Sequence, residues 1–168
     1  NAVAMGFNAG QTNQGINAVA IGSSTAGSTQ GQYAVAMGFY AGNNTQGTNA
    51  IALGYYAGQT TQGTNAVAMG TNAGEINQGE NAIALGIYAG QSDQRRNSIA
   101  LGVYSGSTNQ GINAIAIGQL AGTQNQGTAT VALGYYAGYT NQNQFAVAIG
   151  SNAGYTNQGT NAIALGRN

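Results

Sequence analysis

Residues 49–64 read NAIALGYYAGQTTQGT, and variants of this block recur along the whole chain of 168 residues. In its first part, two large apolar side chains (Ile51 and Leu53) alternate with alanine, and Gly54 follows. Strict alternation with β-branched residues is typical of a β-strand, and glycine supplies the backbone conformations that tight turns need. The block therefore predicts one clear strand, a bend, a second short extended segment and a turn.

Every full unit of the repeat has the length of the quoted block. Glycine stands at the sixth position of every unit, and glutamine stands at the fourteenth position of every full unit. Because the first residue is Asn1 rather than methionine, we expect the chain to be a segment of a longer one. We interpret residues 1–168 as one repeat domain, with units 1–16, 17–32, 33–48, 49–64, 65–80, 81–96, 97–112, 113–128, 129–144 and 145–160 and a half unit 161–168.

A helical interpretation fails, because one to three glycines in each unit would each cost about 1 kcal/mol in a helix and no stripe of period 3.6 is present. The pattern instead predicts an all-β protein, a parallel β-solenoid or β-roll with one unit per coil and about ten and a half coils. Parallel ladders would join equivalent residues of successive coils and give a rod roughly 50 Å long. We expect Val3, Met5 and their copies to be buried and the copies of Gln14 to stack as an amide ladder. The shifted Ala-Gly pair in Ser23–Gly27 predicts a local irregularity.

The composition excludes several classes of function. Charged residues make up 4% of the chain, with three basic and three acidic residues and neither histidine nor cysteine. The usual general bases, thiol nucleophiles and zinc or iron–sulfur ligands are therefore missing, so we predict no enzyme, no catalytic residues, no metal and no cofactor. A net charge of zero argues against nucleic-acid binding. No apolar run reaches the ~18 residues of a membrane span, so we expect no membrane insertion by this segment.

Two surface columns are candidates for ligand binding. Aromatic residues gather at positions 7 and 8, and Tyr55, Tyr56, Tyr135 and Tyr136 are candidate contacts for a glycan or a partner protein. The alternative is that these rings stack over the bend and stabilise it. Threonine recurs at position 12, as on ice-binding solenoids, but the column is broken at several units, for example by Ile76.

Alanine occupies almost every second and fourth position of the units. If the large residues fill the interior of the roll, these alanines point outward and form an apolar stripe larger than a monomer usually exposes. The stripe then predicts a homo-oligomer with closed cyclic symmetry. The reverse assignment, with alanine inside a very thin roll and Val or Ile outward, requires a partner even more strongly. The predicted interface consists of Ala4, Ala20, Ala36, Ala52, Ala68, Ala84, Ala100, Ala116, Ala132, Ala148 and Ala164.

The blocks NAVAMG, NAVAIG and NAIALG resemble the head repeats of trimeric autotransporter adhesins, the YadA-like family, whose core reads Asn-Ser-Val-Ala-Ile-Gly. Residues 97–102, NSIALG, are the closest copy, and the resemblance covers the whole chain. The family repeat is usually shorter than the units of this chain, whereas similar arrays of the present unit length occur in fibre-like proteins of large DNA viruses and phages. The resemblance implies a left-handed roll, three chains around one axis, and a stiff surface fibre or adhesin.

Taken together, these observations predict a structural fibre or filament segment on a cell or virion surface, outside the cell. The rod would associate with copies of itself, most readily as a trimer, and could continue end to end as a filament or contact a host-surface receptor. The alternative is a binding module that uses one face of the solenoid for a glycan or, with less support, for ice.

Overall fold

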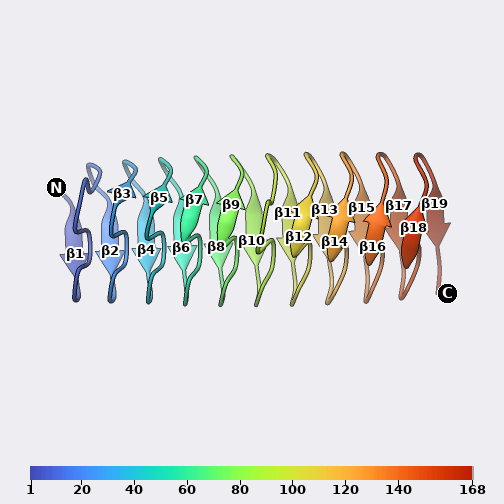
Figure 1. Cartoon of the computed structure of the whole chain (residues 1–168), viewed down its shortest axis with the longest axis horizontal. Coiled ribbons are helices and arrows are strands. Elements are labelled where there is room, and N and C mark those ends of the chain that lie inside the picture. Colours follow the sequence, from blue (N-terminus) through green and yellow to red (C-terminus); the bar gives the residue numbers. More distant parts are fainter. Residues whose placement is uncertain (168) are drawn as a thin grey trace.

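The computed structural model describes residues 1–167 and shows a rod of stacked coils that runs from one terminus to the other (Figure 1). All regular structure in this part of the chain is β-strand, and every strand is short. The strands are β1 (Val3–Met5), β2 (Val19–Ile21), β3 (Thr29–Gln30), β4 (Val35–Met37), β5 (Thr45–Gln46), β6 (Ile51–Leu53), β7 (Thr60–Gln62), β8 (Val67–Met69), β9 (Ile76–Gln78), β10 (Ile83–Leu85), β11 (Ile99–Leu101), β12 (Thr108–Gln110), β13 (Ile115–Ile117), β14 (Gln124–Gln126), β15 (Val131–Leu133), β16 (Thr140–Gln142), β17 (Val147–Ile149), β18 (Thr156–Gln158) and β19 (Ile163–Leu165).

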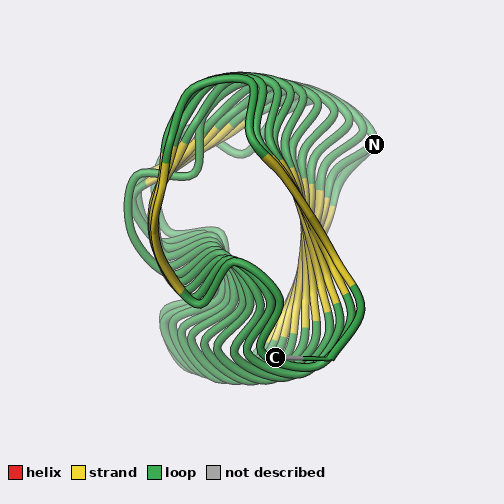
Figure 2. Cartoon of the chain, turned by 90° about the vertical axis from the view of Figure 1, so that its right-hand side faces the viewer, coloured by secondary structure: helices red, strands yellow, loops and turns green. Residues whose placement is uncertain are grey.

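The strands form one long sheet and two short ones, all parallel. The long sheet has eleven strands in the order β1-β2-β4-β6-β8-β10-β11-β13-β15-β17-β19 and contains positions 3 to 5 of every unit. The short sheets, β3-β5-β7-β9 and β12-β14-β16-β18, contain positions 12 to 14. Viewed along the axis, successive coils superimpose with a slight rotation (Figure 2).

The register confirms the predicted period of one coil per unit. Ile83 pairs with Val67 on one side and with Ile99 on the other, which are the equivalent residues of the preceding and following units. The same offset of one unit holds from Val3↔Val19 to Val147↔Ile163. The predicted parallel β-solenoid is therefore the observed fold.

The core of the rod differs from the one that the sequence predicts. Its side chains are the alanines of positions 2, 4 and 9 together with the glutamines of position 14, as at Ala82, Ala84, Ala89 and Gln94, each 0% exposed. Val3 and Met5 are exposed, and their interior copies are half-buried or exposed on the outer face. The prediction of a Val/Met core is therefore wrong: the narrow interior of this coil accommodates alanines and extended amides, and the large apolar residues lie outside.

The predicted glutamine ladder is confirmed. Gln78 Nε2 donates to the backbone oxygens of Val67 (2.8 Å) and Ala82 (3.4 Å) and to Gln94 Oε1 in the next coil (3.1 Å). Gln62 Nε2 in turn donates to Gln78 Oε1 at 3.1 Å. Each buried amide NH₂ thus bonds across its own coil, and five Gln-to-Gln bonds join neighbouring coils. Among the described residues, the amide oxygens of Gln30, Gln62, Gln110 and Gln126 are buried without a partner, so the side-chain ladder is interrupted between these bonded groups.

Glycine is required at two columns for different steric reasons. Gly86 at position 6 has φ +128°, and an added Cβ would lie 2.7 Å from the backbone oxygen of Gly102. Gly90 at position 10 has φ +51°, and its Cβ would lie 2.6 Å from Gln94 Oε1 in the core. The first column allows the coils to stack, and the second makes room for the buried amide.

In the segment Ser23–Gly27 the residue types differ from those of other coils, but the backbone hydrogen bonds to neighbouring coils continue. Ala26 takes the left-handed conformation that glycine has in other coils (φ +47°), and its N–H bonds to Ala41 O at 3.0 Å. Thr25 replaces the buried alanine of position 9, and its hydroxyl donates to the backbone oxygens of Gly38 and Ile21. The predicted irregularity is therefore a polar substitution in the core, while the ladder of this segment continues.

Candidate interaction surfaces

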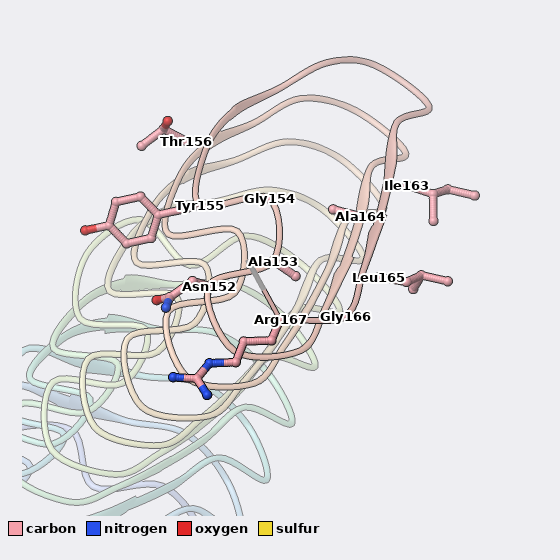
Figure 3. A pocket seen from close by; sticks show the side chains of 10 residues that line it. All are labelled: Asn152, Ala153, Gly154, Tyr155, Thr156, Ile163, Ala164, Leu165, Gly166 and Arg167. Carbon is pink, nitrogen blue, oxygen red and sulfur yellow. The ribbon is translucent and has the colours of Figure 1, made fainter.

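The most extensive apolar surface of the rod is the outer face of the eleven-stranded sheet. Figure 3 shows the alternation that creates it at β19: Ile163 and Leu165 point away from the coil, whereas Ala164 points inward. Along the sheet, Met69, Leu133 and Ile149 at position 5 are 41%, 40% and 38% exposed. We call these outward side chains of positions 3 and 5 the apolar stripe; it extends through all eleven strands.

Most alanines of the predicted interface are buried inside their own chain. From Ala20 to Ala148, every position-4 alanine is 0% exposed within its own chain, so none of them can contact a second chain. Ala4 in the first coil is exposed and Ala164 in the last is half-buried. The observed arrangement is the reverse assignment that the sequence leaves open, with alanine inside and Val or Ile outside. Any contact between chains on this sheet therefore uses the apolar stripe.

Aromatic rings on the outside of the bend form two patches that contain the predicted tyrosines, and a separate stacked pair, Tyr88–Tyr104, lies between them along the chain. In the first, Phe39 stacks on Tyr55 (ring centroids 5.4 Å apart) and Tyr40 stacks on Tyr56 (5.3 Å), while Tyr55 meets Tyr56 edge to face at 4.4 Å. Aromatic pairs at such distances add stability beyond their buried area. The rings therefore stabilise contacts between adjacent coils, as expected if they stack over the bend rather than bind a ligand. Tyr55 is nevertheless 50% exposed.

The second patch lies further along the rod, on its last two full coils. Tyr135 meets Tyr136 edge to face at 4.5 Å, and Tyr139 stacks on Tyr155 at 5.1 Å. Partial desolvation raises the pKa of Tyr135, with Tyr136 as the next cause, and desolvation together with Tyr55 raises the pKa of Tyr56. These two phenols are therefore neutral at physiological pH. The structure brings Tyr55 next to Tyr56 and Tyr135 next to Tyr136, in two separate patches.

Two exposed ladders of asparagine amides run along the rod. At position 1, the Nδ2 of each asparagine donates to the Oδ1 of the equivalent asparagine in the next coil at 3.1–3.2 Å, from Asn49 through Asn65, Asn81 and Asn97 to Asn113, which only accepts. At position 13, a second ladder joins Asn109, Asn125, Asn141 and Asn157. Sequence reasoning missed the second ladder, although the recurrence of asparagine at position 13 is a visible signal for it. Both columns have left-handed φ values of 53–58°, which asparagine tolerates better than most residues.

Five of the six charged side chains lie within residues 75–96. The short sheets are interrupted in this region, because Ser92 forms only isolated bridges to Ile76 and Thr108. Asp93, Arg95 and Arg96 line a shallow cleft there with Asn77, whose amide donates to Asp93 Oδ1 at 2.9 Å. Glu80 and Arg96 occupy the same position in adjacent coils, and both are exposed.

Neither a metal centre nor a membrane-spanning helix is found in the part of the chain that the structure describes. Within residues 1–167, no group of three His, Cys, Asp or Glu side chains could hold a metal ion. No helix of sufficient length and apolarity to cross a bilayer occurs in this range.

Comparison with known proteins identifies the family. The model of the YadA head domain repeat matches residues 30–57, 60–73, 96–121 and 110–137, which together are half of the chain. No curated protein and no solved structure matches the chain. The fold and the family match define a structural protein of adhesin type rather than a member of a known enzyme family. The chain belongs to the family of YadA head domain repeats, as its NSIALG-like blocks predict; the viral and phage resemblance stays a prediction.

Proposed function

We propose that this chain is a segment of a stiff fibre on a cell or virion surface, in which three copies pack together through their apolar stripes. The observation that carries the proposal is the apolar stripe itself. It places two large apolar side chains per coil on the outer face of one continuous sheet, while the chain's own core is filled by alanine and glutamine. An apolar surface that extends through a whole molecule is typical of a protein–protein interface.

The number of copies is supported by the family and by the shape of the stripe. YadA head domains form trimers. The stripe repeats once per coil along the rod and turns slightly with the coils (Figure 2), so parallel copies that wind around one symmetry axis can bury it over their whole length. Self-association leaves the other faces, with their aromatic patches and asparagine ladders, available for a receptor or for continuation into a filament.

Paired charge substitutions test the stripe. Met69→Glu combined with Leu133→Glu places two carboxylates on exposed stripe positions of β8 and β15 without entering the core. We expect multi-angle light scattering to show that the wild-type chain has the mass of three copies and that the double variant is monomeric and folded. A matched control, Thr108→Glu combined with Thr156→Glu, changes exposed residues of the short sheet β12-β14-β16-β18 and should leave the trimer intact.

A monomeric wild-type chain at micromolar concentration would contradict the proposal. So would a control that dissociates as completely as the stripe variant. Substitution of Ala68 or Ala84 by glutamate does not test the interface, because both alanines lie in the core and a charge there unfolds the chain itself.

A second candidate function is glycan binding, and the exposed aromatic patches favour it. Tyr55 and Tyr135 are each 50% exposed and lie in clusters of rings, on which sugar faces can stack. A glycan array with the wild-type chain and with Tyr55→Ser and Tyr135→Ser variants tests this function. Binding that both variants lose supports it, and equal binding by all three proteins, or none, contradicts it. Ice binding has weaker support, because Ile76 and Gln124 interrupt the threonine column; a thermal hysteresis assay tests it.

A further inference from the structure

Three pairs of tyrosines stack ring on ring between adjacent coils. The centroids of Tyr40 and Tyr56 lie 5.3 Å apart, those of Tyr88 and Tyr104 4.8 Å apart, and those of Tyr139 and Tyr155 5.1 Å apart. The interplanar angles are only 9°, 9° and 16°. The two members of each pair occupy the same position in successive units and therefore belong to neighbouring coils. The pairs occur near the beginning, the middle and the end of the rod.

The backbone holds the two position-8 pairs in register. Tyr56 N donates to Phe39 O, and Tyr104 N donates to Ile87 O, each at 2.9 Å. All four tyrosines have φ of 55–56°, a left-handed conformation that is unfavourable for a bulky side chain. Asparagine, which suits this conformation, occupies the same position in other coils, as at Asn8, Asn72 and Asn152. The backbone conformation therefore does not favour tyrosine at position 8, and the reason for tyrosine there must lie in the contacts of its ring.

We propose that these three pairs are sites of dityrosine cross-linking, in which an oxidant of the peroxide class, acting through a haem peroxidase, joins adjacent coils covalently. Each phenol loses one electron and one proton and becomes a tyrosyl radical. The two radicals couple through the ring carbons next to their hydroxyl groups, and one carbon–carbon bond forms. The coupled rings are at first cyclohexadienones; each coupled carbon releases its hydrogen as a proton and each ketone oxygen takes up one proton, which restores the aromatic rings and the phenols. One hydrogen peroxide takes up the two electrons and two protons and becomes two waters.

Proximity favours coupling within the chain. Rings as close as those of Tyr88 and Tyr104 react as an intramolecular pair with a high effective concentration, far above that of a second molecule in micromolar solution. Oxidisable side chains of other types are few, because the chain has no cysteine and no tryptophan and only three methionines. The competitors are the neighbouring phenols Tyr55 and Tyr136, which meet Tyr56 and Tyr139 edge to face rather than ring on ring. All six residues are half-buried or exposed. An oxidant at the surface can therefore take electrons from their rings without the chain unfolding.

A cross-link of this kind would supply a covalent connection between coils in addition to the backbone itself. Each linked pair closes a loop of one coil, and closing such a loop restricts the unfolded chain in the way that a disulfide does. Three links spread along the rod would connect coils 3 to 4, 6 to 7 and 9 to 10. The expected consequence is a rod that resists thermal and detergent unfolding after oxidation.

The test is oxidation of the full chain at micromolar concentration with hydrogen peroxide and a haem peroxidase. We expect dityrosine fluorescence, and a product with the mass of one chain less two hydrogens for each link formed. Peptide mapping should place the bonds at Tyr40–Tyr56, Tyr88–Tyr104 and Tyr139–Tyr155. The oxidised chain should also unfold at a higher temperature than the untreated chain.

Matched variants separate the stacked pairs from tyrosine content in general. The test variant carries Tyr40→Phe, Tyr88→Phe and Tyr139→Phe, which keep the stacked rings but remove one phenol from each pair. The control carries Tyr33→Phe, Tyr55→Phe and Tyr135→Phe and retains the same number of tyrosines. We expect the mapped bonds to disappear in the test variant and to persist in the control. Equal cross-linking in both variants, bonds only between different chains within one assembly, or no dityrosine at all would each overturn the proposal.

Discussion

Truncation of one buried glutamine should destabilise the rod far more than truncation of an exposed glutamine nearby in the same coil. Gln142 is 1% exposed, whereas Gln144 is exposed. Gln142 Nε2 donates to the backbone oxygens of Val131 (2.8 Å) and Ala146 (3.2 Å) and to Gln158 Oε1 (3.1 Å). Its Oε1 accepts from Gln126 Nε2 at 3.2 Å. The side chain therefore connects both sides of its coil and both neighbouring coils.

The magnitude follows from these contacts. Each hydrogen bond contributes about 1 kcal/mol net, and a buried partner left without its bond adds a desolvation cost. With these bonds lost, Gln158 Oε1 unpaired and a small cavity formed, Gln142→Ala should lower the free energy of unfolding by about 3–5 kcal/mol. Gln144→Ala removes an exposed side chain and should change it by less than about 0.5 kcal/mol.

The assay is urea unfolding followed by far-ultraviolet circular dichroism, with both variants and the wild type at one protein concentration. A fixed concentration is needed because self-association raises the apparent stability. Because repeat proteins can unfold in parts, the slope of the transition is compared as well as its midpoint. Equal losses in the two variants would refute the argument that the amide ladder, and not the surface glutamine, stabilises the coils.

Three further predictions concern the coil contacts, the core and the surface charges. Gly86→Ala should lower the free energy of unfolding by about 2–4 kcal/mol, because its φ of +128° and the Gly102 oxygen leave no room for a Cβ. Gly159→Ala, whose added Cβ would have no atom within 4 Å, should leave that free energy nearly unchanged in the same urea assay. Ala84→Val should destabilise the folded chain by about 2 kcal/mol or more through overpacking, whereas Leu85→Ala should mainly weaken the association of chains. Thermal unfolding measures the first effect and light scattering the second. The opposite pattern would mean that the inner and outer faces of β10 are exchanged. Glu80→Gln should change the free energy of unfolding by at most about 1 kcal/mol, because Glu80 and Arg96 are both exposed; a loss of several kcal/mol would place these charges at a contact between chains.

Much of the fold is predictable from the repeat alone. The constant spacing of the units determines the coil and its register, and the invariant glutamine indicates the column of buried amides, whose side chains bond to one another in three separate runs between Gln30 and Gln158. The direction of the strand faces is not predictable in the same way. Alternation in NAIALG shows that the two faces differ, but which one turns inward depends on the space inside the coil. General preferences rank Ile, Val and Leu ahead of alanine among buried residues, whereas the interior of this rod is filled by alanine and glutamine.

The candidate surfaces were predictable only in part. The aromatic columns are visible in the sequence, and Tyr55–Tyr56 and Tyr135–Tyr136 do lie together. An alanine interface follows only if the large apolar residues fill the core, so a wrong prediction of the core leads directly to a wrong prediction of the interface. The stacked pair Tyr139–Tyr155 involves position 11, where only two coils carry tyrosine, and a column of two gives little signal in the sequence.

In the proposed trimer, the large apolar side chains face outward because other copies of the chain cover them. Small-angle X-ray scattering from the wild-type chain, reduced to mass per unit length of the rod, tests it most directly. One coil advances about 4.8 Å along the axis in a parallel ladder. We expect the mass of three such coils for every advance of that length. The mass of a single coil over the same length would contradict it.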